Sequence, residues 1–210
     1  MNNTAKCQDQ IHLEVRFCEL WSRCLRSGIV APPRHPWHEL HSHYNESHRF
    51  YHTLLHIGYC LNELDQARTY LDQPDAVEMA LWFHDVIHSP NCDNERQSCE
   101  LFSQLGNGCF SQDFLNTVRS LIMATTHKVK PDYSDQAFIC DIDLSSLGAP
   151  WKIFLSDSHA LRLEHSHDSD EEFYRGKLKF FESLLSRQQI FHTDYFREKF
   201  EENARQNIGH

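Results

Sequence analysis

Three ionisable side chains follow a strongly apolar stretch of this chain at close spacing. His84 and Asp85 come directly after the sequence Ala-Leu-Trp-Phe at residues 80–83, and His88 follows shortly afterwards. A charged carboxylate and an imidazole without partners in an apolar setting would cost several kcal/mol. A bound cation compensates for that cost, and a neutral imidazole beside a carboxylate suits a borderline divalent metal. We therefore expect His84 and Asp85 to lean toward one ion, with His88 one helical turn further along roughly the same face.

Two further stretches carry side chains that suit the same ion. His52 and His56 are an i, i+4 pair in a segment with the apolar period of a helix, so both can point into one cavity. Asp141 and Asp143 lie in a short segment that is otherwise apolar, and either of them could be a ligand. Helical bundles build metal sites from inward-pointing side chains on facing helices. The candidate ligands are therefore one of these aspartates and three earlier residues: His56, His84 and Asp85.

The elements that must position these side chains are predicted to be helices. Helical periodicity recurs along the chain, and the alternation typical of strands is almost absent. Ser111 and Thr193 are expected helix caps, and Ser169 with Glu172 forms an expected capping box. Prolines at 32, 33 and 36 predict a rigid loop. We predict an all-α, single-domain bundle over residues 1–210, with about eight to ten helices. The expected helices span residues 7–25, 47–71, 74–89, 94–106, 111–125, 136–147, 151–164, 169–185 and the segment after 193.

The amino-acid composition and net charge argue against some classes of binding partner. The chain has 210 residues with 30 acidic and 20 basic side chains, and its net charge is −10. This charge argues against nonspecific binding of nucleic acid or of an anionic membrane, whereas a small phosphorylated molecule stays compatible. We expect a cytoplasmic protein, because neither a signal peptide nor a membrane-spanning run is evident. The eight cysteines lack C-x-x-C spacing, so reduced thiols are expected rather than disulfides. The oligomeric state stays open, and a homodimer is one alternative.

The ordered set of His56, the His84-Asp85 pair and Asp143 resembles the H…HD…D signature of the HD superfamily of metal-dependent phosphohydrolases. Within that superfamily, residues 51–56 are similar to the Tyr-His-Asn-x-x-His stretch of the cyclic-nucleotide phosphodiesterases. The chain resembles one subfamily of HD phosphohydrolases most, through stretches at 49–57, 83–85, 94–98, 125–127, 141–144 and 204–207. Together these stretches spread the resemblance over almost the whole chain.

This resemblance implies an HD-type helical fold, in which N-terminal and C-terminal helices pack on a metal-binding core of residues 47–148. It implies one or two divalent ions (Mn, Mg, Co, Fe, Ni or Zn), with Asp85 as the bridging ligand if there are two. The implied metal ligands are His56, His84, Asp85 and Asp143. The implied activity is hydrolysis of a phosphate ester, of a nucleotide or another small phosphorylated metabolite, by metal-activated water. Cyclic nucleotides are a poor expectation, since the glutamine-clamped pocket of the phosphodiesterases has no visible counterpart.

Further roles follow from the resemblance, each with a structural alternative. His52 stands where the phosphodiesterases have their general acid, or it is a structural hydrogen-bonding residue. His88 could serve catalysis through a second ion or a water, or lie at the helix surface. His127 could be an extra ligand or a phosphate contact, or a favourable cation at a helix end. Glu95 could orient a ligand or be a first-turn acid.

The basic side chains that would bind the phosphate group of a substrate are harder to identify. Arg49 and Lys128 are close in sequence to the proposed ligands, and other basic residues on the C-terminal helices could line the mouth of the site: Arg162, Arg175, Lys177 and Arg205. A solvated or ion-paired surface position is the alternative for each of them.

Two rival functions use the same residues. A di-iron oxygenase of the HD type would need extra histidine ligands, which His88 and His127 could supply. A noncatalytic module would use the metal structurally, but a closed structural zinc site usually includes cysteine, and no cysteine has suitable spacing.

Overall fold

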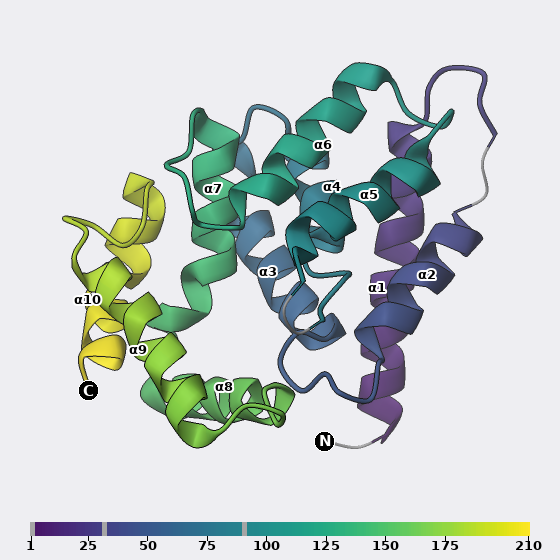
Figure 1. Ribbon diagram of the computed structural model, residues 1–210. Coiled ribbons are helices and arrows are strands. Elements are labelled where there is room, and N and C mark those ends of the chain that lie inside the picture. Colours follow the sequence, from purple (N-terminus) through teal and green to yellow (C-terminus); the bar gives the residue numbers. More distant parts are fainter. Residues whose placement is uncertain (1–2, 31–32, 90–91) are drawn as a thin grey trace.

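The computed structural model describes residues 3–30, 33–89 and 92–210, with side chains described from Ile11 onward. The described residues form ten α-helices and two short 3-10 helices and contain no strand, which confirms the predicted all-α class (Figure 1). The α-helices are α1 (Asn3–Cys24), α2 (Arg34–Tyr44), α3 (Leu54–Ala67), α4 (Pro74–Phe83), α5 (Asn94–Gly106), α6 (Gln112–Ala124), α7 (Ser134–Leu144), α8 (Trp151–Glu164), α9 (Asp170–Leu185) and α10 (Asp194–Gly209). The 3-10 helices are η1 (Arg68–Tyr70) and η2 (Ser145–Gly148).

Helix α4 is the centre of the molecule. Every residue from Ala76 to Phe83 is buried, as expected for a helix that is apolar on all sides and surrounded by others. It contacts α1, α3, α5, α6 and α7, which surround it in Figure 1. Its buried Glu78 is neutralised by ion pairs with Arg16 and Arg68. The end of α4 therefore delivers the residues that follow Phe83 into the interior of the protein.

Helix α10 lies on the side of α7 away from α1 and α2, and α8 lies at the bottom of the view in Figure 1. Helix α10 packs on η2, where the Asn207 amide donates to the carbonyl oxygens of Leu147 and Ala149. One cluster of buried apolar side chains includes residues of all ten α-helices, from Phe17 on α1 to Ile208 on α10. None of the described helices has the length and apolar character needed to cross a bilayer.

Several predicted helix boundaries are confirmed. The side chains of Ser111 and Thr193 accept the capping hydrogen bonds at the starts of α6 and α10. Ser169 and Glu172 form the reciprocal capping box before α9. Helix α8 has the predicted bounds. These ends could be found because a cap is a local interaction between a side chain and the backbone a few residues away.

The prediction of a rigid loop at the three prolines is partly wrong. Pro36 lies in the first turn of α2, where a missing N–H costs nothing because first-turn N–H groups lack intrahelical partners. Pro33 directly precedes that helix, and Pro32 lies outside the described residues.

The helix predicted over residues 47–71 is too long at both ends. Helix α3 starts at Leu54 after Thr53, whose side chain accepts from the backbone N–H of Leu55. His52 therefore precedes the helix instead of lying on it. The α-helical geometry ends at Ala67 and tightens into η1.

The helix carrying the His-Asp pair is also shorter than predicted. Helix α4 ends at Phe83, so His84 and Asp85 form the turn after it and His88 lies beyond that turn. The physical reason is that the buried Arg49 guanidinium donates to the carbonyl oxygens of Asp85 (2.7 Å) and Val86 (2.7 Å). Because Arg49 already serves as hydrogen-bond donor to these two carbonyl oxygens, they need no N–H partner from a further helical turn.

Seven cysteines are free thiols: Cys18, Cys24, Cys60, Cys92, Cys99, Cys109 and Cys140. The side chain of Cys7 lies outside the described part of the chain.

The close packing of η2 on α10 predicts a steric effect of Gly148→Ala. A Cβ atom at this position would lie 2.6 Å from the Phe200 Cβ and 2.9 Å from the Phe200 carbonyl oxygen. We expect Gly148→Ala to lower the free energy of unfolding by about 1–3 kcal/mol, since backbone cannot move aside cheaply. Urea unfolding measures the change. Gly58→Ala on α3, which meets nothing within 4 Å, is the control and should be neutral or stabilising. Equal stability of the two variants would contradict this packing.

Candidate metal centre

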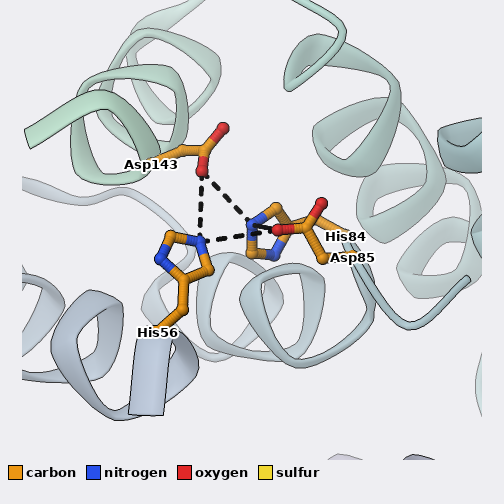
Figure 2. Close-up of side chains that lie close together, drawn as sticks. All are labelled: His56, His84, Asp85 and Asp143. Atoms are coloured by element: carbon orange, nitrogen blue, oxygen red, sulfur yellow. Dashed lines mark ion pairs between the residues drawn. The ribbon is translucent and has the colours of Figure 1, made fainter. Parts of the chain in front are cut away.

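Four side chains from three separate elements converge on one point. His56 comes from α3, His84 and Asp85 from the turn after α4, and Asp143 from the last turn of α7 (Figure 2). The His84 Nε2 lies 3.0 Å from the Asp85 Oδ2 and 3.3 Å from the Asp143 Oδ1. The His56 Nε2 lies 3.5 Å and 3.4 Å from the same two oxygens. One donor atom of each residue therefore lies within 4.8 Å of all the others, close enough to share an ion.

The hydrogen bonding of His84 fixes which nitrogen faces the cluster. Its Nδ1 donates to the Leu81 carbonyl oxygen at 2.9 Å, so the neutral ring presents the lone pair of Nε2. That Nε2 is buried and has no hydrogen-bond partner. It faces two carboxylate oxygens, which also carry lone pairs. A cation, either a proton or a metal ion, must lie among these atoms to hold them together.

Electrostatics keep the two carboxylates ionised. Burial alone would raise the pKa of Asp85, but His84, His52 and His56 hold it well below its usual range. The pKa of Asp143 is likewise lowered despite burial, first by the hydrogen bond from His127 and then by His56 and His84. Two ionised carboxylates and two imidazoles form a donor set that fits a borderline divalent ion. A metal ion here would compete with protons on the histidines.

Arg49 positions this turn and does not reach the cavity. Its side chain is fully buried, lies against the Tyr44 ring, and donates to the carbonyl oxygens of His52, Asp85 and Val86. The sequence alternative of a solvated or ion-paired surface residue is half right, because Arg49 pairs with Glu46 at 3.0 Å but its side chain is buried. Arg49 instead ties the segment before α3 to the turn after α4.

His52 is oriented by a buried glutamate that sequence reasoning missed. The His52 Nδ1 donates to the Glu164 Oε2 at 2.6 Å. The other Glu164 oxygen accepts the backbone N–H groups of Phe50, Tyr51 and His52 at 2.7–2.8 Å. Burial raises the pKa of Glu164, but the bonds from His52 and the backbone outweigh it and lower the pKa to about 2. The His52 Nε2 is thereby left 4.0 Å from the Asp85 Oδ2, beside the four-residue cluster.

His88 does not join the four-residue cluster. Its ring stacks on the His52 ring with centroids 4.1 Å apart, and its Nε2 lies 3.5 Å from Glu164. Burial and the neighbouring His52 lower its pKa to about 4, so the ring is neutral. His52, His88 and Glu164 together could also hold a metal ion. The short hydrogen bond between His52 and Glu164 already satisfies this group, whereas the His84 Nε2 is unsatisfied, so the first cluster fits a metal better.

His127 and Glu95 lie at the edge of the site. The His127 Nε2 donates to the Asp143 Oδ2 at 2.9 Å, which leaves the Asp143 Oδ1 facing His56 and His84. This residue adopts a left-handed backbone conformation with φ +54° at the end of the turn after α6. Glu95, in the first turn of α5, borders the same cavity.

Asp141 is separate from the cluster. Its two oxygens accept the backbone N–H groups of His192 and Thr193 and the Thr193 hydroxyl, each at 2.7 Å. Burial raises its pKa to about 6. Of the two aspartates that the sequence left open, Asp143 faces the histidines and Asp141 holds the chain that enters α10.

The other candidate cations are dispersed. Lys177 borders the cavity beside three aromatic rings, and burial lowers its pKa. Arg162, Arg175 and Arg205 are paired with Asp170, Glu171 and Glu201. Lys128 borders a different cavity, on the far side of His127.

The cluster opens into a cavity of about 450 Å³. Asp85, Asp143 and His52 lie on one wall, and the opposite wall comes from α8 and α9. That wall combines apolar side chains with polar ones: Phe154, Leu161, Phe173, Phe180 and Phe181 alternate with Asp157, Ser158, Glu172 and Lys177. A cavity of this size admits a small organic molecule.

Comparison of the chain with protein-family models, with curated proteins and with solved structures finds no match.

The different surroundings of the two aspartates predict opposite effects of removing them. Asp143→Ala should lower metal affinity by more than about 100-fold, because even residues that only orient ligands contribute 10–100-fold. Asp141→Ala should retain metal but lower the free energy of unfolding by about 2 kcal/mol or more, since three buried donors lose their acceptor. Metal content after Mn²⁺ loading and desalting, together with urea unfolding, measures both. Loss of metal in Asp141→Ala alone would reverse the assignment.

The lowered pKa of Glu164 predicts an acid-sensitive contribution to stability. Because the folded-state pKa, about 2, lies below the ordinary value of 4.5, ionised Glu164 stabilises the fold above that value and loses this effect as the pH falls. The stability difference between the wild type and Glu164→Gln should therefore be largest near neutrality and shrink in acid. Urea titrations at several pH values measure it, with Glu171→Gln on exposed α9 as the control. A difference that stays constant with pH would contradict the prediction.

Proposed function

We propose that this protein is a metal-dependent phosphohydrolase of the HD type, acting on a small phosphate ester. The observation that supports this most is the unsatisfied His84 Nε2, which lies beside His56 and faces two ionised carboxylates that border a cavity. The resemblance of these four positions to the HD signature points the same way. The domain boundary of residues 1–210 and a cytoplasmic location stay predictions.

In this proposal His56, His84, Asp85 and Asp143 hold one divalent ion. When bound, the ion acts as a Lewis acid that lowers the pKa of water and neutralises charge on the phosphoryl group. His84 contributes the nitrogen that its bond to Leu81 leaves free. Asp143 is kept in place by His127.

His52 supplies the proton for the leaving oxygen. Its Nδ1 is fixed by Glu164, so its Nε2 is the atom that can carry a proton into the cavity. The Glu164 carboxylate orients the ring, and a general acid must be held within reach of the atom that it protonates. His88 holds the His52 ring by stacking and is not itself a proton donor in this account.

The cavity walls favour a substrate with an organic part beyond the phosphate. The aromatic side chains Phe154, Phe173 and Phe181 can pack against such a group, and Lys177 lies among their rings. Lys177 is the only Lys or Arg among the described residues that border this cavity. One cation suits a monoester better than a polyphosphate.

Asp85→Asn tests the proposal directly. Wild-type protein should hydrolyse members of a panel of phosphate monoesters with Mn²⁺, Mg²⁺, Co²⁺ or Fe²⁺, and Asp85→Asn should lose that activity while keeping its helical circular dichroism. Asp157→Asn is the matched control, because Asp157 borders the same cavity outside the four-residue cluster. Hydrolysis retained by Asp85→Asn would reject the proposal. Oxygen consumption by the iron-loaded protein without phosphate release would favour the oxygenase instead.

His52→Gln tests the proton donor separately. We expect kcat to fall by about 10²–10⁴-fold with metal content unchanged. His88→Gln, which removes the stacked ring without removing the donor, should have a smaller effect. Equal losses in the two variants would show that His52 acts only through packing.

A further inference from the structure

A second cavity, of about 520 Å³, lies on the other side of His127 from the metal centre. One wall is the segment that follows α6, with Lys128 and Lys130. The other wall is the connection between α9 and α10, with Arg187 and His192, and Arg197 at the start of α10. His127 borders both cavities.

The charge of this second cavity is opposite to that of the chain. Two lysines and two arginines border it, together with two histidines, although the whole chain carries a net charge of −10. No Asp or Glu is among the described residues that border it. Of the four cations, only Arg197 has a carboxylate partner, Asp194, within the described part of the chain. Lys128, Lys130 and Arg187 thus face the cavity with their charges uncompensated.

The pKa of His192 reflects the positive charges around it. Burial lowers the pKa of this histidine, and the positive charges of Arg187, His127, Lys130 and Arg197 lower it further. Like charges repel, so the fold must hold them together by other interactions.

The wall between α9 and α10 is held by hydrogen bonds from side chains of neighbouring elements, most of them partly buried. Arg205 donates to the carbonyl oxygens of Arg187 and Gln188. Glu201 accepts the backbone N–H groups of Ile190 and Phe191. Asp141 accepts those of the next two residues. Most of this connection is therefore held in place by the protein itself, and pre-organisation of this kind lowers the cost of binding.

We propose that this cavity is a binding site for a multiply charged phosphate group, separate from the metal centre. Guanidinium and ammonium groups without carboxylate partners are the complement of phosphate oxygens, and arginine can bind two of them at once. Lys128, which the sequence suggested as a phosphate contact of the metal site, serves this second site instead. The ligand class is a small anion bearing a diphosphate or a comparably charged phosphate group. The site does not depend on the hydrolase activity.

Isothermal titration of the full chain with inorganic diphosphate at constant ionic strength tests this site. We expect saturable binding with one diphosphate per chain. Lys128→Gln/Lys130→Gln, which changes two exposed side chains, should weaken binding by about tenfold or more, and Arg187→Gln should do the same. Lys152→Gln/Lys179→Gln removes the same charge from exposed positions on α8 and α9 and should leave the affinity unchanged.

Three results would overturn the proposal. The first is the absence of saturable binding in the wild type. The second is an equal loss in both double variants, which would show nonspecific attraction. The third is binding that a chelator abolishes and Lys128→Gln/Lys130→Gln leaves intact, since that would place the diphosphate at the metal centre.

Discussion

Two imidazoles and two ionised carboxylates share one buried space at the end of α4, and this arrangement is stable only with positive charge among them. The His84 ring cannot rotate to move its Nε2 away from the carboxylates, because its Nδ1 is hydrogen-bonded to the Leu81 carbonyl oxygen. The helices around α4 bury the histidine side of the cluster, whereas Asp85 and Asp143 are partly exposed toward the cavity. The apolar core thus creates the need for a cation, and the cavity beside Asp85 and Asp143 gives a cation and a substrate access to it.

Two buried charged residues of opposite sign position the reactive side chains. Arg49 binds the carbonyl oxygens of His52, Asp85 and Val86, and Glu164 binds the N–H groups of Phe50, Tyr51 and His52. Each therefore satisfies backbone groups that no helix supplies with partners. Because both act on the segment before α3, His52 is held at a fixed place relative to the His-Asp turn. The four-residue cluster and His52, the proposed proton donor, are consequently held by one connected set of hydrogen bonds.

The sequence predicted the parts of this molecule that depend on local interactions or on polar residues in apolar surroundings. The caps at Ser111 and Thr193 are local, and the His84-Asp85 pair is conspicuous beside an apolar run. Glu164 was missed because it is one of 30 acidic residues and its partners are more than 100 positions earlier in the chain. The choice between Asp141 and Asp143 was not decidable from spacing, since it depends on the path of the chain into α10. The start of α3 was placed too early, at Ser47, although the apolar period begins at Leu54 and Thr53 caps the helix there. The HD resemblance, the substrate and the partner stay predictions.

The central claim is that one divalent ion is bound by His56, His84, Asp85 and Asp143, and a crystal of the protein soaked in Mn²⁺ tests it most directly. The account predicts an anomalous difference peak at coordination distance, about 2.0–2.3 Å, from a nitrogen of each histidine and an oxygen of each aspartate. A peak among His52, His88 and Glu164 with none at the four-residue cluster, or no peak at either place, would contradict it.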